Sequence, residues 1–312
     1  VAHLNILSAF ISPAIIKELK SHNIPVVMSL RDFSIICCQS FCLYKNKPCE
    51  ACKNHRYYRG LLRKCTHNSF LQSLGNVLQK YWYNKFRNIY DLVDIFIAPS
   101  NFIKTKLIEM GFKHNIAYLP NFIFIESEPS YSWERKNIVY MGKLEVHKGI
   151  FDLLEAVKQL DVSLTIIGAG NSRLDIEKYL KRERLSHKVI IKGFLSGEEL
   201  YHEIRNAMFT VCPSIWYENN PRVIIDSFLL GKPVVASNIG GIPELVKDYK
   251  TGLLFEPANV EDLQKKISIL INNENLIIAM GKSARKVVEK ELNPEKHYKQ
   301  LIAIYKSMEM IG

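Results

Sequence analysis

The second half of the chain alternates short apolar runs with amphipathic segments, and this alternation constrains the fold more than any other feature. Five runs have the length and composition of buried strands: Asn137–Met141, Leu164–Ile167, Val189–Ile191, Phe209–Val211 and Pro233–Ala236. The segments between them have apolar residues at helical spacing: Lys148–Leu160, Ser172–Arg184, Glu198–Ala207 and Pro221–Leu230. Such short apolar strands separated by helices predict a parallel sheet covered on both faces. Ligands of such sheets bind beyond the carboxyl ends of the strands.

The first half has the same character but is interrupted. Strands are predicted at Ile24–Met28, Ile95–Ala98 and Ile116–Leu119, and helices at Pro13–Ser21 and Phe102–Met110. Between them lie an irregular, cysteine-rich stretch over Arg31–Asn68 and a helical stretch over Phe70–Tyr90 that is rich in aromatic and basic residues. The segment Ile123–Trp133 has the composition of an interdomain linker. We therefore expect two α/β domains.

Composition narrows the class of partner without choosing one. The chain has 312 residues, 47% of them apolar, and a formal net charge of +11. This charge favours nucleotides, anionic lipid surfaces or nucleic acid. No apolar run reaches the roughly 18–20 residues of a membrane-spanning helix. The sequence begins Val-Ala-His with neither an initiator Met nor a basic leader, so we expect an internal fragment or a processed chain.

Six of the seven cysteines lie between Cys37 and Cys65. Within the insertion 37–65, Cys38, Cys49, Cys52 and Cys65 include one C-x2-C pair, a spacing that suits tetrahedral zinc. The alternative is a set of buried free thiols, which pack as small hydrophobes. A zinc ion there would be structural rather than catalytic.

The stretch from Pro213 to Asp226 carries the strongest chemical signal. Glu218 lies in a loop beyond a predicted strand, and Pro221 suits the first position of a helix. The unpaired amides at that helix start would face an anion such as a pyrophosphate. Asp226, one and a half turns further on, could accept both hydroxyls of a ribose. The alternative is that Arg222 and Asp226 form only an i,i+4 surface pair, worth about 0.2–0.5 kcal/mol.

Two lysines follow the first strand of the second half, in Gly142-Lys143-Leu-Glu-Val-His-Lys148-Gly149. Two cations near a helix start could neutralise a diphosphate. The alternative is a pair of solvated lysines in a basic protein. The nearby Gly168-Ala-Gly170 is not followed by the remaining glycine of a dinucleotide fingerprint, which argues against a dehydrogenase.

These motifs together resemble the retaining glycosyltransferases of group 1, which have the two-domain GT-B fold. Tyr217-Glu-Asn-Asn-Pro221 and the acids at 218 and 226 are similar to the paired-acid motif of that family, and the segments 231–237 and 240–244 also match. The resemblance is most specific between Ile138 and Phe255. The chain also resembles bacterial exopolysaccharide and capsule members of the family, which have a similar cysteine-rich insertion.

The resemblance implies roles for individual residues. Glu218 and Asn219 would contact the donor sugar, Asp226 the ribose, and Gly168 and Phe194 the surroundings of the nucleobase. The departing diphosphate would be stabilised by cations and helix amides, without a catalytic metal. The residues assigned to phosphate binding are Gly142, Lys143, Lys148, Pro221, Arg222 and Val223. Glu218, Lys148 and Arg31 are the candidates for the reaction centre.

The sequence departs from the family pattern at three of these positions. Asp226 and Lys143 stand where the family usually has Glu and Arg, and Lys lacks the bidentate fork of Arg. Arg31 stands where the family usually has a His that contacts the donor sugar or the acceptor. Because Arg cannot act as a base at neutral pH, this change puts turnover in doubt more than donor binding.

The sequence therefore predicts an α/β protein with two Rossmann-like domains, the first of them incomplete. Residues 1–125 form the partial acceptor-side domain and residues 134–295 the donor-binding domain, while a helix over 296–312 packs back towards the first domain. The expected reaction moves a sugar from a nucleotide sugar, expected to be a UDP-sugar, to a saccharide or lipid-linked acceptor with retention, in polysaccharide or cell-envelope glycan synthesis. The alternatives are a non-catalytic nucleotide-sugar-binding protein and, with less support, a nucleic-acid-binding protein.

Two further expectations concern location and turnover. The aromatic and basic residues of 70–90 predict contact with an anionic membrane, placing a cytoplasmic protein at the inner face of the cell membrane, although a buried helix is the alternative. Val1–Asn5 resembles a strand from the middle of the family's N-terminal domain. We therefore expect the family's early strands to be missing, and this chain to bind a donor but to transfer sugar poorly or not at all.

Overall fold

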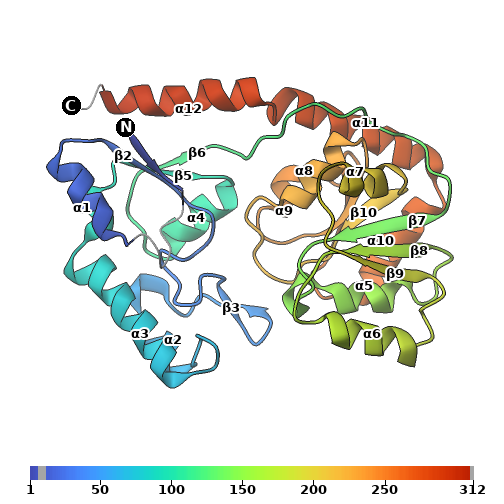
Figure 1. Cartoon of the computed structure of the whole chain (residues 1–312), viewed down its shortest axis with the longest axis horizontal. Helices are drawn as coiled ribbons and strands as arrows, with labels where there is room; N and C mark the ends of the chain where they lie inside the picture. The colour runs from blue at the N-terminus through green and yellow to red at the C-terminus, as the bar shows by residue number, and fades with distance from the viewer. Residues whose placement is uncertain (6–11, 310–312) are drawn as a thin grey trace. The chain divides into compact units, whose positions relative to one another are not determined.

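The computed structural model describes residues 1–5 and 12–309 and divides the chain into two compact units. Unit 1 comprises residues 1–121 and 297–312, and unit 2 comprises residues 122–296. Figure 1 shows the chain coloured from its N-terminus to its C-terminus, with the elements labelled. Each unit is built around a parallel sheet and has its own core.

Unit 2 contains a six-stranded parallel sheet in the order β12-β11-β10-β7-β8-β9. The strands are β7 (Asn137–Met141), β8 (Ser163–Ile167), β9 (Val189–Gly193), β10 (Phe209–Cys212), β11 (Val234–Ser237) and β12 (Gly252–Phe255). The helices are α5 (Ile150–Val157), α6 (Arg173–Arg182), α7 (Gly197–Arg205), α8 (Arg222–Leu229), α9 (Ile242–Leu245), α10 (Val260–Ile271) and α11 (Glu274–Glu291). The strand order reverses at β7, which is the switch point where such sheets bind ligands.

The core of unit 2 lies on both faces of this sheet. On β7, Ile138 packs with Leu153 and Leu270 in one cluster, whereas Val139 packs in another with Ile204. Successive side chains of a strand point to opposite faces, so a strand covered on both sides must be apolar at every position. The short uninterrupted apolar runs of the sequence arise from this requirement.

Unit 1 contains a four-stranded parallel sheet in the order β1-β2-β5-β6. Its strands are β1 (Ala2–Leu4), β2 (Val26–Ser29), β5 (Ile95–Ala98) and β6 (Ile116–Tyr118), and its flanking helices include α1 (Ala14–Ser21) and α4 (Asn101–Glu109). The helix α12 (Pro294–Glu309) places Leu301, Ile304 and Met308 against the β2 and β5 side chains of this sheet. This helix is thereby part of the core of unit 1, and the last three residues of the predicted helix, 310–312, lie outside the described residues.

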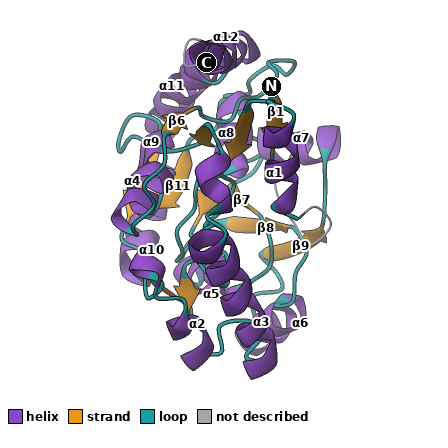
Figure 2. Cartoon of the chain, turned by 90° about the vertical axis from the view of Figure 1, so that its left-hand side faces the viewer, coloured by secondary structure: helices purple, strands orange, loops and turns teal. Residues whose placement is uncertain are grey.

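A long insertion separates β2 from β5. It contains a hairpin of β3 (Leu43–Tyr44) and β4 (Lys47–Pro48), then η1 (Lys53–His55), α2 (Tyr58–Leu62) and α3 (Phe70–Tyr81). Helix α3 continues into η2 (Trp82–Phe86), a π-helical turn, and η3 (Ile89–Leu92) leads into β5. Figure 2 shows these helices in purple, joined by loops in teal. The helical stretch predicted over 70–90 is present but is not one continuous α-helix, because the winding changes at Trp82 and a separate 3-10 turn begins at Ile89.

The segment predicted as a linker, Ile123–Trp133, is part of unit 2 instead. Ile123 is buried, and its amide donates to the carbonyl of Leu292 at 2.9 Å. The amide of Ser130 donates to the carbonyl of Leu230 at 3.0 Å. The polar composition arises because this segment runs over the surface of the unit, where backbone groups can pair without a regular element.

Candidate functional site

Glycines allow the loops at the carboxyl ends of β7, β8 and β10 to lie close together. Gly168, directly after β8, has a φ of +146°, and a Cβ there would lie 1.8 Å from the carbonyl oxygen of Gly142. Gly149, between η4 (Val146–Lys148) and α5, has a φ of +71°, and its Cβ would lie 1.8 Å from the carbonyl oxygen of Pro213. No side chain fits at either position, so glycine is required at both for the backbones of these loops to come into contact.

The Glu218 carboxylate is the centre of a polar cluster in this loop region. Its Oε1 accepts hydrogen bonds from the ammonium of Lys148 at 2.6 Å, the hydroxyl of Ser214 at 2.6 Å and the indole N–H of Trp216 at 2.8 Å. Glu218 is only 8% exposed, so the ion pair with Lys148 is largely shielded from water. Three donors on one oxygen hold this side chain and leave Oε2 to accept from a ligand.

Lys148 is positioned by η4 and by contact with the loop after β10. Its ammonium lies 4.7 Å from the centre of the Trp216 ring, within the range of a cation–π interaction. The amide of Ile215 donates to the carbonyl of His147 at 3.0 Å, which ties the two loops together. The lysine is therefore a fixed cation and not a solvated surface residue.

Helix α8 begins beside this cluster. Pro221 precedes it in an extended conformation and, as the residue at the N-cap, makes no side-chain hydrogen bond to the first turn. Its first amides and its positive dipole end are therefore open to an anion. A small cavity of about 130 Å³ lies here, and its lining includes Gly142, Lys148, Ser214, Glu218, Pro221, Arg222 and Val223. The volume suits a single small group, such as a phosphate.

Asp226 lies on α8 and is 7% exposed. The Nε of Arg222 donates to its Oδ1 at 3.0 Å, so the i,i+4 pair considered from the sequence is present. Burial raises the pKa of Asp226, and the neighbouring Arg222 opposes this effect. The carboxylate is thus buried and held by one donor, and it retains the capacity to accept further hydrogen bonds.

The remaining predicted donor contacts lie around the same strand ends. Lys143 is exposed, and its carbonyl accepts a hydrogen bond from the Tyr140 hydroxyl at 2.8 Å. The amide of Gly168 donates to the carbonyl of Gly193 at 2.6 Å, which brings the ends of β8 and β9 together. Phe194, next in the chain, is 76% exposed and presents its ring to solvent. Asn219, beside Glu218, is half-buried.

Arg31 belongs to unit 1 and lies just beyond the carboxyl end of β2. Its guanidinium donates to the side chains of Asn121 at 2.9 Å and Asn5 at 3.1 Å. His3 lies nearby, and burial together with the charge of Arg31 lowers its pKa. The Nδ1 of His3 is 2.7 Å from the Tyr305 hydroxyl. Sequence reasoning missed His3, although a histidine within a short strand between apolar neighbours is a usable signal.

The cysteines group differently from the predicted set. The neighbouring thiols of Cys42 and Cys52 lower the pKa of Cys37 well below its ordinary value, against the effect of burial. The thiol of Cys52 likewise lowers the pKa of Cys38, whereas the sulfur of Cys49 accepts a hydrogen bond from the Arg63 guanidinium at 2.9 Å. Over residues 1–5 and 12–309, no three Cys, His, Asp or Glu side chains are arranged to hold a metal ion. The zinc assignment to Cys38, Cys49, Cys52 and Cys65 therefore stays a prediction.

No helix in the described residues is both long enough and apolar enough to cross a membrane. The insertion of unit 1 nevertheless carries exposed aromatic side chains, Trp82 and Phe86 among them.

Comparison with known proteins places these features in a family. The model of the family "Glycosyl transferases group 1" matches residues 125–287, just over half of the chain. An uncharacterised glycosyltransferase of Methanocaldococcus jannaschii is 31% identical over 200 residues, which are 63% of this chain and 55% of that protein. The alpha-D-kanosaminyltransferase of Streptomyces kanamyceticus is 27% identical over 180 residues, 56% of this chain and 46% of that protein. The chain thus spans about half the length of these relatives.

Solved structures have the same fold at low sequence identity. Sucrose-phosphate synthase from Thermosynechococcus elongatus superposes with a TM-score of 0.77 and 19% identity, covering 99% of this chain and 74% of that one. The HepE protein of Anabaena, solved in complex with UDP, superposes with a TM-score of 0.75 and 17% identity, covering 98% and 79%. The two Rossmann-like α/β units are therefore those of the GT-B fold. The chain belongs to the glycosyl transferases group 1 family.

Proposed function

We propose that this protein binds a UDP-sugar in unit 2 and transfers the sugar to a saccharide or lipid-linked acceptor, with retention at the anomeric carbon, in polysaccharide or cell-envelope glycan synthesis. The observation that carries the proposal is the cavity at the start of α8, where the Lys148–Glu218 pair meets open helix amides. The match to the family model over 125–287 includes all of these residues.

The donor would bind with its diphosphate at this cavity. Lys148, the exposed Lys143 and the first amides of α8 would stabilise the negative charge that develops on the leaving group. Fixed cations and amides do this without reorganisation during the reaction, and the mechanism requires no metal ion for it. Val223 and Lys148 line the same cavity, so one phosphate could contact both the Val223 amide and the Lys148 ammonium.

The two acids would hold the sugars at either side of the diphosphate. Glu218 presents Oε2 to the hydroxyls of the transferred sugar, while Oε1 is occupied by its three donors. Arg222 donates one hydrogen bond to Oδ1 of Asp226, and the carboxylate can accept further bonds. Asp226 would use these to bind the ribose hydroxyls. UDP in the complex of the Anabaena HepE protein supports the choice of nucleotide.

A thermal-shift screen over UDP-, GDP- and dTDP-sugars tests the proposal, because a ligand that binds only the folded state raises the melting temperature. We expect UDP-sugars to give the largest shift. Incubation of the best donor with saccharide acceptors, followed by NMR of the anomeric proton, then tests transfer and retention. A shift with another nucleotide alone, or an inverted product, would contradict the corresponding part of the proposal.

A second candidate, a nucleotide-sugar-binding protein without transfer activity, is favoured by one observation. Arg31 stands where a family His is expected, and two asparagines hold its guanidinium. Donor binding with neither transfer nor hydrolysis would support this alternative. Recovery of activity in Arg31→His would assign the loss to that residue.

A further inference from the structure

The insertion of unit 1 concentrates most of the net charge of the protein. Residues 51–90 contain eight Lys and Arg residues and no Asp or Glu, a formal charge of +8 against +11 for the whole chain. This stretch comprises η1, α2, α3 and η2. A segment of this length without one acid presents an uncompensated positive field to solvent.

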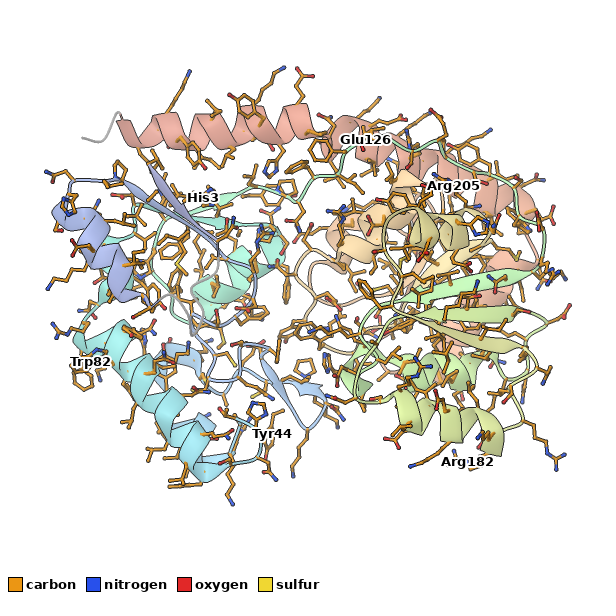
Figure 3. All side chains as sticks on the ribbon, in the orientation of Figure 1. His3, Tyr44, Trp82, Glu126, Arg182 and Arg205 are labelled. Carbon is orange, nitrogen blue, oxygen red and sulfur yellow. The ribbon has the colours of Figure 1, made fainter. Side chains whose placement is uncertain are left out.

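An apolar stripe runs along the solvent side of α3 and η2. Leu71, Leu78, Trp82 and Phe86 are exposed by 77%, 59%, 50% and 71%. Their spacing of seven, four and four residues places them on one helix face. We call these four side chains the outer stripe. Figure 3 shows Trp82, which is labelled, at the outer side of this helix.

The outer stripe is not the core face of α3. The core face contains Ser73 and Val77, which are buried, and Lys80, whose ammonium donates to the carbonyl of Ser34. The helix therefore packs on unit 1 through one face and leaves large apolar side chains on the other. Exposed aromatic and leucine side chains in a row indicate a surface that becomes covered.

The π-helical turn brings the stripe and the charges together. A groove of about 760 Å³ lies along it, lined by Leu78, Gln79, Tyr81, Trp82, Tyr83, Lys85 and Phe86. The Arg87 guanidinium lies 5.0 Å from the centre of the Trp82 ring. Lys85, which lines the groove, and Arg87 are both exposed. Aromatic rings flanked by cations are the pattern of side chains at a membrane interface.

We propose that the outer stripe inserts into the interface of a bilayer that contains anionic lipids, with the surrounding Lys and Arg residues at the headgroups. The uncompensated charge selects this occupant over a second copy of the chain, because two such segments facing each other would repel. Anionic headgroups supply the complementary charge, and the acyl region receives Leu71, Leu78 and Phe86. This proposal does not depend on donor binding, because its test measures only the association of the chain with lipid.

Vesicle co-sedimentation tests the proposal on the whole chain. Vesicles of phosphatidylcholine with roughly 30% phosphatidylglycerol, which have an anionic surface, are compared with pure phosphatidylcholine at low and high salt. We expect binding to the anionic vesicles at low salt, and at least a tenfold loss with salt or without phosphatidylglycerol. Leu78→Ser with Phe86→Ser, and separately Lys85→Glu with Arg87→Glu, should each weaken binding at least tenfold.

The matched control is Leu174→Ser, because Leu174 is 67% exposed on α6 of unit 2, outside the outer stripe. It should bind vesicles as the unsubstituted chain does. Vesicles should shift the tryptophan emission of the unsubstituted chain to the blue. This shift should disappear in Trp82→Phe, which would show that the outer stripe is the part that enters the bilayer. Circular dichroism melting confirms that each variant is folded.

Three results would overturn the proposal. The first is the absence of binding to anionic vesicles at low salt. The second is equal loss in the Leu174→Ser control and the stripe variants. The third is self-association of the chain through the outer stripe without binding to vesicles. Light scattering would then show an oligomeric mass for the unsubstituted chain and a smaller mass for Leu78→Ser/Phe86→Ser.

Discussion

Replacement of Lys148 by Ala is the sharpest single-residue test of the site in unit 2. The ammonium of Lys148 is 2.6 Å from Oε1 of Glu218, and the two side chains are 19% and 10% exposed. Removing one partner of a buried pair costs about 3–5 kcal/mol when the other charge is left uncompensated. Here Ser214 and Trp216 still donate to the carboxylate, so we expect a smaller loss of stability, about 1–3 kcal/mol.

The effect on ligand binding should depend on the phosphates. Loss of a charged hydrogen bond costs about 1.5–3 kcal/mol, which corresponds to a roughly 10- to 150-fold weaker affinity for UDP. Uridine has no phosphate, so its affinity should change little. Isothermal titration calorimetry with both ligands, at a temperature where the variant is folded, measures the difference. Lys178→Ala, at a 78%-exposed lysine of α6, is the control and should leave both affinities unchanged.

An equal loss of affinity for UDP and for uridine in Lys148→Ala would contradict the assignment of this lysine to the phosphates. Equal losses would mean that Lys148 supports the loops through Glu218 and Trp216 and has no phosphate partner. Unchanged UDP affinity would likewise remove the lysine from the donor site.

Three further predictions follow from buried groups of unit 2. Asp226→Ala should weaken UDP binding by about 1.5–3 kcal/mol with an unchanged circular dichroism spectrum; unchanged affinity in calorimetry would leave Asp226 only as a partner in its helix. Burial lowers the pKa of Lys232 from an ordinary 10.5 to about 8. Between these values the unfolded chain binds the proton and the folded chain does not, so the free energy of unfolding should rise with pH by about 3 kcal/mol from this group. Urea melts from about pH 7.5 to about pH 10 should show this rise in the unsubstituted chain but not in Lys232→Met, and parallel pH profiles would contradict the assignment. Gly168→Ala should destabilise the chain by about 3 kcal/mol or more, because the new Cβ meets the Gly142 carbonyl; a melting temperature within a degree of the parent would show that the loops can separate.

The fold of unit 2 could be predicted because its signals are local. The runs that form β7 to β11 are apolar at consecutive positions, and the helices between them have regular spacing. The strand β12, Gly252–Phe255, was missed because Lys250 and Thr251 before it, with Gly252 at its start, have the composition of a turn. The segment 123–133 was misassigned for a similar reason, since its polar composition gives no sign of the backbone pairing to Leu230 and Leu292.

The chemistry of the site could be predicted only as residue types at strand ends. Lys148 and Glu218 are 70 residues apart in the chain, and their pairing follows from the adjacency of β7 and β10 in the sheet. The thiol cluster shows the limit of spacing arguments. The C-x2-C spacing pairs Cys49 with Cys52, whereas the side chains that act on Cys37 are those of Cys42 and Cys52. Contacts of this kind depend on tertiary packing, and the spacing of residues along the chain does not predict them.

A crystal structure of the chain with UDP is the most direct test of the central claim. We expect the diphosphate at the cavity before α8, within hydrogen-bonding distance of the Lys148 ammonium and the Val223 amide. We also expect both ribose hydroxyls at Asp226 and no metal ion between the phosphates and the protein. UDP bound elsewhere, or bound at this cavity with its ribose away from Asp226, would contradict the claim.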